Sequence, residues 1–114
     1  MARRQVRAAL SMHGLGEYAD DAEIITSELV TNAVQHACAH GTKTIGVSLT
    51  HTGSPAAVTV AVSDSSPHGP IKRDTPPGSE QGRGLQIVVA LSAQWGWRRE
   101  DGGKAVFAVL VGEV

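Results

Sequence analysis

The sequence lacks several features that define whole classes of proteins. It has a single cysteine, Cys38, so an internal disulfide is excluded, and no cluster of histidines and cysteines at zinc-ligand spacing accompanies it. Only 4% of the residues are aromatic, too few for the stacking surfaces that bind single-stranded nucleic acids. Lys and Arg number 10 against 11 Asp and Glu, and this net charge of −1 gives no electrostatic basis for direct binding of nucleic acid or of an anionic membrane.

Long apolar runs are also absent. The arginines near the N-terminus are not followed by the apolar segment of a signal peptide, because polar residues and the glycines Gly14 and Gly16 interrupt the pattern. No segment approaches the roughly 18 apolar residues that suggest a membrane span. These absences predict a soluble cytoplasmic protein, and an unpaired thiol agrees with a reducing compartment.

What remains is the composition of an ordinary folded domain. The chain has 114 residues, of which 41% are hydrophobic and 18% charged. A domain of this length buries about two-thirds of the surface that its unfolded chain exposes, so one hydrophobic core is feasible without disulfides or metals. We therefore expect residues 1–114 to form a single domain.

The first third of the chain has helical periodicity. Val6 and Leu10 lie one turn apart in a helix expected over residues 2–12, which ends at the glycines that follow. A second helix is expected from a cap at Asp20 or Asp21 to Ala39. Its apolar positions predict one broad buried face: Ala22, Ile25, Leu29, Val30, Ala33, Val34 and Ala37.

The rest of the chain alternates between strand patterns and one further helix. Apolar residues recur at every second position over 45–49 and 58–62, which predicts an antiparallel hairpin around a turn at 52–55. A long loop is expected over 65–81, then a helix opened by Gly84, and strands over 95–99 and 105–111. The fold class is therefore α+β, a two-layer sandwich of a mostly antiparallel mixed sheet with three helices on one face.

Polar side chains recur along the second helix. Glu28, Asn32 and His36 follow one another at intervals of four, so the first two share a face, at the border of the apolar arc. A carboxamide oxygen there suits Mg²⁺, and a carboxylate can deprotonate a nucleophile. Taken alone, the pair favours an ordinary polar helix edge, and His36 alone is more often a structural histidine than a ligand.

Two further positions have chemistry of their own. Asp64 follows the valines of the second strand at period two, so its carboxylate is expected on their face, either to bind the amino edge of a base or as an ordinary turn aspartate. Gly82-Arg83-Gly84-Leu85 stands where the long loop meets a helix. Glycines and a helix N-terminus suit a phosphate, although such junctions often need glycine for backbone reasons alone.

These three motifs, in this order, resemble those of the Bergerat-fold ATPase and kinase superfamily known as GHKL. The segment 28–37 resembles its N-box, Asp64 the aspartate of its G1 box, and the segment 82–85 its G2 box, with 65–81 in the place of the ATP lid. Within the superfamily, Ser27-Glu28-Leu29-Val30-Thr31-Asn32-Ala33 and the compact size most resemble the small anti-sigma-factor serine kinases of actinobacterial type.

The resemblance implies an ATP- and Mg²⁺-dependent protein-serine kinase. It implies that Glu28 is the catalytic base, that Asn32 ligates the metal and that Asp64 binds the adenine amino group. The nucleotide-binding residues that follow from it are Asn32, His36, Asp64, Gly69, Gly82, Arg83, Gly84 and Leu85. Such kinases phosphorylate a serine of an anti-anti-sigma partner and sequester a sigma factor, commonly as homodimers.

The chain departs from the family pattern at three places. Asp64 is followed by Ser-Ser-Pro, and the first glycine after it is Gly69, whereas the family usually has glycines directly. Ala105 stands where a threonine is expected near the adenine, and the strand that often precedes the first helix is missing, as in a trimmed chain. These departures motivate an alternative function, a catalytically inactive module that binds a protein in a nucleotide-dependent manner.

Overall fold

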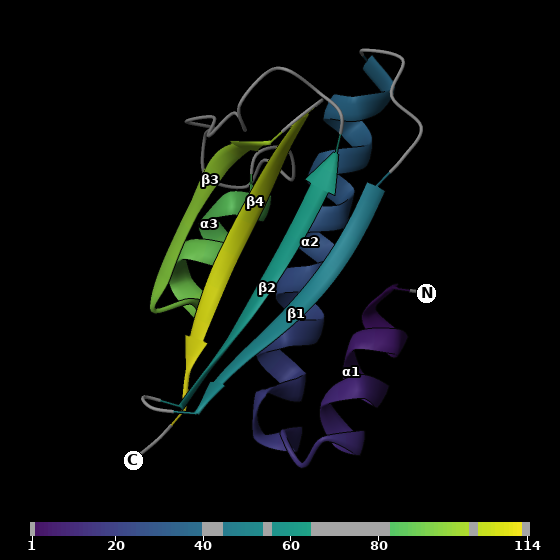
Figure 1. Ribbon diagram of the computed structural model, residues 1–114. Coiled ribbons are helices and arrows are strands. Elements are labelled where there is room, and N and C mark those ends of the chain that lie inside the picture. The colour runs from purple at the N-terminus through teal and green to yellow at the C-terminus, as the bar shows by residue number, and fades with distance from the viewer. Residues whose placement is uncertain (1, 40–44, 54–55, 65–82, 101–102, 113–114) are drawn as a thin grey trace.

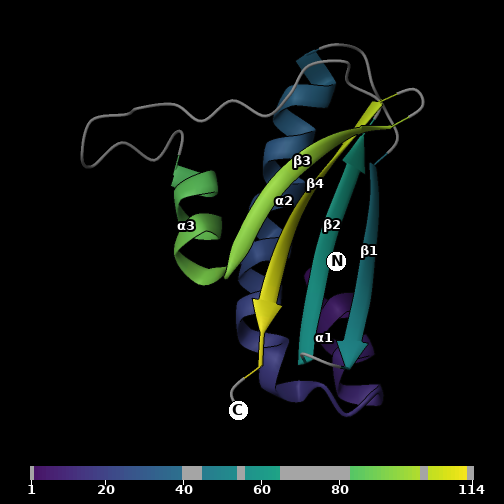
Figure 2. The same cartoon turned by 60° about the vertical axis from the view of Figure 1, so that its left-hand side comes forward.

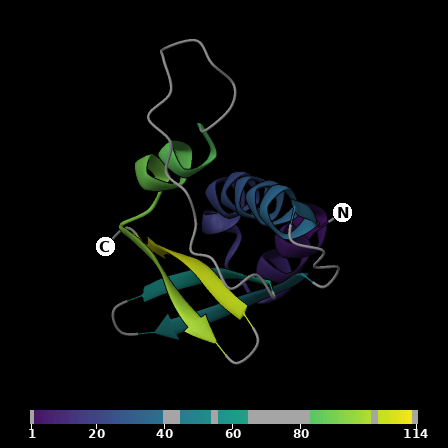
Figure 3. The ribbon, with the colours of Figure 1, turned by 90° about the horizontal axis from the view of Figure 1, so that it is seen from above.

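The protein folds into two layers, a sheet and a layer of helices. The computed structural model describes residues 2–39, 45–53, 56–64, 83–100 and 103–112. Within these ranges three α-helices and a short 3₁₀ helix accompany four strands (Figure 1). All three α-helices lie on one face of the sheet, and no element of the described ranges covers the other face (Figure 3). The predicted α+β architecture is confirmed.

The first helix, α1 (Ala2–Met12), has the predicted bounds and buries the predicted residues, Val6 and Leu10. Its polar face is tied to the next helix by Arg7. Nη2 of Arg7 lies 2.6 Å from Oδ1 of Asp20, and its Nε donates to a carboxylate oxygen of Glu23. Hydrogen bonds to these two carboxylates raise the pKa of the Arg7 guanidinium.

The second helix, α2 (Ala19–Ala39), begins earlier than the predicted aspartate cap. A 3₁₀ helix (Gly16–Tyr18) leads directly into it, and the Ala19 N–H bonds to the Gly16 carbonyl. Asp20 and Asp21 therefore lie inside the first turn, where their charges suit the positive end of the helix dipole. The cap prediction was wrong because it placed the helix start at the first capping residue type and overlooked the 3₁₀ turn.

The buried face of α2 is narrower than predicted. Ala22, Ile25, Leu29 and Ala33 are buried, but Val34 is 41% exposed. At about 100° per residue, Val34 lies about 180° around the helix from Ile25, so it points away from the sheet. Apolar character alone had assigned it to the buried face.

The sheet contains β1 (Ile45–Gly53), β2 (Ala56–Asp64), β3 (Gln94–Glu100) and β4 (Gly103–Val111) in the order β1-β2-β4-β3. Each neighbouring pair is antiparallel, and the predicted β1–β2 hairpin is confirmed. Because β2 and β3 both pair with β4, the last strand lies between them, and α3 packs beside α2 on the helical face (Figure 2). The long loop expected over 65–81 lies outside the described residues.

The third helix, α3 (Arg83–Leu91), begins one residue before the predicted glycine. At its other end Ser92 closes it, because both the N–H and the hydroxyl of Ser92 donate to the carbonyl of Val88, at 3.0 and 2.6 Å. Leu85 and Val88 face inward and are buried. This helix therefore packs its apolar stripe into the same core as α2.

The core fills the space between the two layers. On β2 the valines at 58, 60 and 62 point inward as the alternation predicts, and burying each such side chain contributes roughly 1.5–3 kcal/mol. The buried cluster consists of Val6, Leu10, Tyr18, Ala19, Ala22, Ile25, Leu29, Ala33, Val58, Val60, Val62, Leu85, Val88, Val106, Ala108 and Leu110. The buried face of α2 thus packs against β2 and β4, and residues of this contact also line the candidate site.

Candidate functional site

The candidate site begins on α2. Glu28 and Asn32 are half-buried, and they flank the buried residues Leu29 and Ala33. This is the position that the helical spacing predicts, at the border of the apolar arc. Asn32 faces the sheet and lines a small hollow, whereas Glu28 is not among the lining residues of that hollow.

The sheet contributes Asp64, the last residue of β2. Its carboxylate continues the inward row of β2 valines, as predicted, and the residue is 7% exposed. Asp64 pairs with Ile45 of β1 on one side and with Lys104 of β4 on the other. The strand therefore delivers a carboxylate to the inner face of the sheet, below α2.

Lys104 is the residue that the sequence analysis missed. Its Nζ donates to Oδ1 of Asp64 at 3.3 Å and lies 3.2 Å from Oδ2, with side-chain exposures of 3% for Lys104 and 1% for Asp64. Such a buried pair is rare, because removing two charges from water is costly unless they compensate each other. The signal was present in β4, since counting back by two from the inward residues Val106 and Ala108 reaches Lys104.

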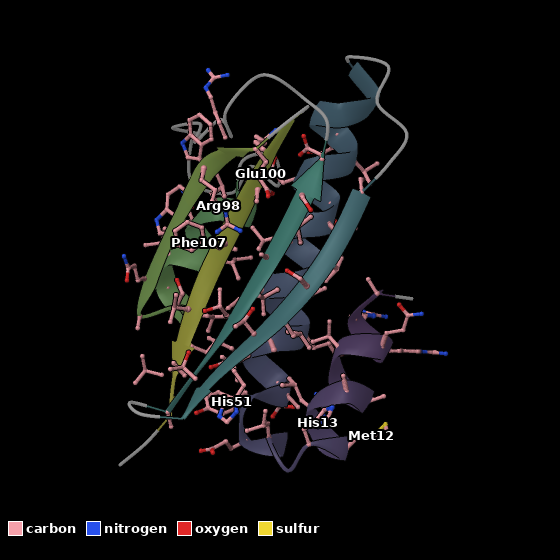
Figure 4. The ribbon with its side chains drawn as sticks, viewed as in Figure 1. Met12, His13, His51, Arg98, Glu100 and Phe107 are labelled. Atoms are coloured by element: carbon pink, nitrogen blue, oxygen red, sulfur yellow. The ribbon has the colours of Figure 1, made fainter. Side chains whose placement is uncertain are left out.

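Ala105, expected near the adenine, lies on the other face of the sheet. It pairs with Ser63 of β2 and with Arg98 of β3, one position out of step with Asp64. On this outer face the Arg98 guanidinium lies 6.0 Å from the centre of the Phe107 ring (Figure 4). The expectation was therefore wrong about the register, and Lys104 is the β4 residue beside Asp64.

The hollow between the layers joins these side chains. It is lined by Leu29, Asn32, Ala33, Val62, Asp64, Lys104 and Val106. The space that a water-sized sphere can occupy in it is about 10 Å³, which is room for about one water. The walls are apolar, from α2 on one side and from the sheet on the other, and the polar groups gather at one end.

This arrangement fits the edge of a flat, partly polar ring. The apolar walls suit the carbon atoms at the edge of such a ring, while a carboxylate, an ammonium and a carboxamide offer both donors and acceptors to its polar atoms. A space of about 10 Å³ receives only that edge, in place of a water, so the remainder of a ring lies outside the hollow. A nucleobase carrying an amino group has this shape and this chemistry.

For the other predicted site residues, the structure describes the backbone position, the side chain or neither. His36 belongs to α2, but its side chain is outside the described part, as are Gly69 and Gly82. Arg83 and Gly84 form the start of α3, and again nothing is described of the Arg83 side chain. Leu85 is 2% exposed and packs into the core, so any contact that it makes with a phosphate comes from its backbone.

Groups for other chemistries lie elsewhere. Within the described ranges, no set of three His, Cys, Asp or Glu side chains is placed to hold a metal ion. His13 and His51 lie at the end of the molecule where α1 and β1 finish, whereas Asp64 lies at the opposite end of the sheet (Figure 4). None of the helices in the described part has the length and hydropathy needed to cross a bilayer. Mg²⁺ commonly completes its coordination with waters and with the phosphates of a substrate.

Comparison with known proteins identifies one family. The family described as "Histidine kinase-like ATPase domain" matches residues 1–110, which is nearly the whole chain. No match is found among curated proteins or among solved structures. The family match spans the helix that holds Glu28 and Asn32, the strand that ends at Asp64 and the strand that holds Lys104.

Proposed function

Because this chain belongs to the histidine kinase-like ATPase domain family of the GHKL superfamily, we propose that it is an ATP- and Mg²⁺-dependent protein-serine kinase of the anti-sigma-factor type. Family membership implies ATP binding. The observation that carries the proposal is the meeting of Asn32 and Asp64, 32 positions apart in the chain, in one hollow with apolar walls.

The nucleotide is held from both layers. Asp64 accepts a hydrogen bond from the amino group of adenine, and the apolar walls of the hollow border the edge of the ring that enters it. Asn32 offers its side-chain oxygen to Mg²⁺, which when bound neutralises charge on the phosphates. The backbone around Gly82 and Gly84, at the start of α3, contributes N–H groups to the phosphates, with Gly69, Arg83, Leu85 and His36 as further contacts.

Glu28 is the proposed catalytic base. Its carboxylate accepts the proton of a serine hydroxyl on the protein substrate while that oxygen bonds to the γ-phosphorus, and the bond to the bridging oxygen breaks to release ADP. Glu28 is half-buried on α2, one turn before Asn32. This supports the role because a carboxylate there is one turn from the proposed metal ligand and still within reach of a partner.

The partner follows from the resemblance of the segment 27–33 to the small anti-sigma-factor kinases. The substrate is an anti-anti-sigma-like protein, a sigma factor is the second binding partner, and the active form is a homodimer. Transcription is then regulated by phosphorylation that changes which partner is bound.

The test separates binding from catalysis. We expect calorimetry to show Mg²⁺-dependent ATP binding that Asn32→Ala and Asp64→Ala weaken. We expect Glu28→Gln to bind ATP as the wild type does but to lose at least about a hundredfold in phosphoryl transfer to a serine substrate, followed with radiolabelled ATP. Thr31→Ala, an exposed neighbour on α2, is the matched control and should leave both activities unchanged.

Two outcomes contradict this function. Absence of ATP binding at millimolar concentration would refute it altogether. Binding with no transfer by the wild type to any candidate partner would replace the kinase by the alternative, a nucleotide-dependent binding module.

A further inference from the structure

The ammonium of Lys104 has more hydrogen-bonding capacity than its surroundings use. It carries three N–H donors, and its hydrogen-bond partner among the described residues is the carboxylate of Asp64. Both distances to that carboxylate, 3.2 and 3.3 Å, are long for a charged pair, in which about 2.7–2.9 Å is usual. Toward the described part of the chain, Lys104 therefore keeps at least one N–H available for a further acceptor.

The available donor belongs to the wall of the hollow. Lys104 lines it together with Asn32 and Asp64, on the inner face of the sheet. Since the lysine is 3% exposed, bulk water supplies little compensation for an unused donor. A buried donor without an acceptor costs free energy, so a ligand that brings an acceptor to this point is favoured.

We propose that Lys104 is a second base-recognition residue, which donates a hydrogen bond to the ring nitrogen of adenine next to the amino group that Asp64 binds. This inference rests on the proposed function, because it specifies how the same site recognises its nucleotide. Lys104 is a specificity-determining residue here, and its hydrogen bond also orients the Asp64 carboxylate at the hollow.

The chemistry of adenine matches the pair. Its amino group is a donor, and the ring nitrogens N1 and N7 on either side of that group are acceptors at neutral pH. A carboxylate and an ammonium about 3 Å apart present the complementary pattern, an acceptor beside a donor. Asp64 alone can hydrogen-bond only to the amino group, whereas the pair can hydrogen-bond to the amino group and to its neighbouring ring nitrogen together.

The test removes the acceptor from the ligand and the donor from the protein. ATP is compared with 1-deaza-ATP and 7-deaza-ATP, which replace N1 or N7 by a C–H group and keep the amino group. For the wild type we expect one of the two analogues to bind at least about tenfold more weakly than ATP, since hydrogen bonds to charged groups are among the strong ones. For Lys104→Met we expect that analogue and ATP to bind equally.

Controls exclude a purely structural role for Lys104. Arg98→Met removes a cation from the outer face of the same sheet and should keep the full preference for ATP over the analogue. Lys104→Arg retains a donor and should keep part of the preference for ATP over the analogue. Where Lys104→Met folds poorly, equal binding of ATP and both analogues by the wild type still overturns the inference, and Lys104→Arg tests the assignment to Lys104.

Three results would overturn the inference, and they are distinguishable. Equal binding of ATP and both analogues by the wild type would show that no donor reads the ring nitrogens. An unchanged preference in Lys104→Met would assign that donor to another residue. No binding of ATP by the wild type would remove the proposed function itself and this inference with it.

Discussion

The ion pair between Asp64 and Lys104 predicts a large, non-additive effect on stability. Lys104→Met keeps an unbranched side chain of similar length but leaves the Asp64 carboxylate buried without its ammonium. Asp64→Asn does the converse. Since the two side chains are 1% and 3% exposed, solvent cannot replace the lost partner, and breaking such a pair typically costs about 3–5 kcal/mol. Domains of this size have a total unfolding free energy of about 5–15 kcal/mol.

The double variant distinguishes this from a loss of packing. With both charges removed, no buried charge remains, and replacing a buried pair by neutral residues is often neutral or stabilising. We therefore expect Asp64→Asn with Lys104→Met to be more stable than either single variant, with a coupling energy of about 3 kcal/mol.

Urea unfolding followed by tryptophan fluorescence provides the measurement. Trp95 and Trp97 of β3 lie beside β4, so their emission reports on the sheet that contains the pair. Arg98→Met, which removes an exposed cation, is the control and should cost less than about 0.5 kcal/mol. Single variants that each cost less than about 1 kcal/mol, with additive effects in the double variant, would refute the buried pair.

Two further predictions concern the helical layer. Ile25→Ala should lower the unfolding free energy by about 2–5 kcal/mol, because it leaves a cavity in the core. Ile24→Ala, at a 44% exposed position, should lower the unfolding free energy far less. Similar losses for the two variants in urea unfolding would contradict the packing of α2. Arg7→Ala should lower the melting temperature by no more than about 3 °C at low salt, because surface ion pairs contribute little. In 1 M NaCl, where the Debye length is about 3 Å, the variant should melt at the same temperature as the wild type. A loss that does not depend on salt would argue against the α1–α2 ion pairs.

Local patterns were sufficient to predict most of the architecture. The spacing of Val6 and Leu10 located α1, and the alternation of the β2 valines placed Asp64 on the inner face. Asn32 and Asp64 were predicted to share a site only through the resemblance to known motifs, and the structure brings both to one hollow. These predictions succeed because a periodic burial pattern is a property of a single element.

The error that matters most for the site concerns a relation between elements. The choice of Ala105 over Lys104 depended on which β4 residue is opposite Asp64, and the register between strands 40 positions apart is not encoded in either strand alone. Burial of a lysine also contradicts its usual preference, so composition argued against it. Val34 was misassigned because apolar character was considered without its angle around the helix.

The strand order has a consequence for how the protein folds during synthesis. β3 leaves the ribosome before β4, yet within the sheet it pairs with β4 and with no other described strand. Until β4 is made, the β1–β2 hairpin can form with the first two helices. At that stage β2 has no partner on the edge that later pairs with β4, and β3 has no pairing partner. One edge of β2 and both edges of β3 then stay open on the nascent chain, where a chaperone or a second nascent chain can pair with them. Completion of the sheet, and with it the burial of the charge beside Asp64, is therefore a late event that waits for the segment 103–111.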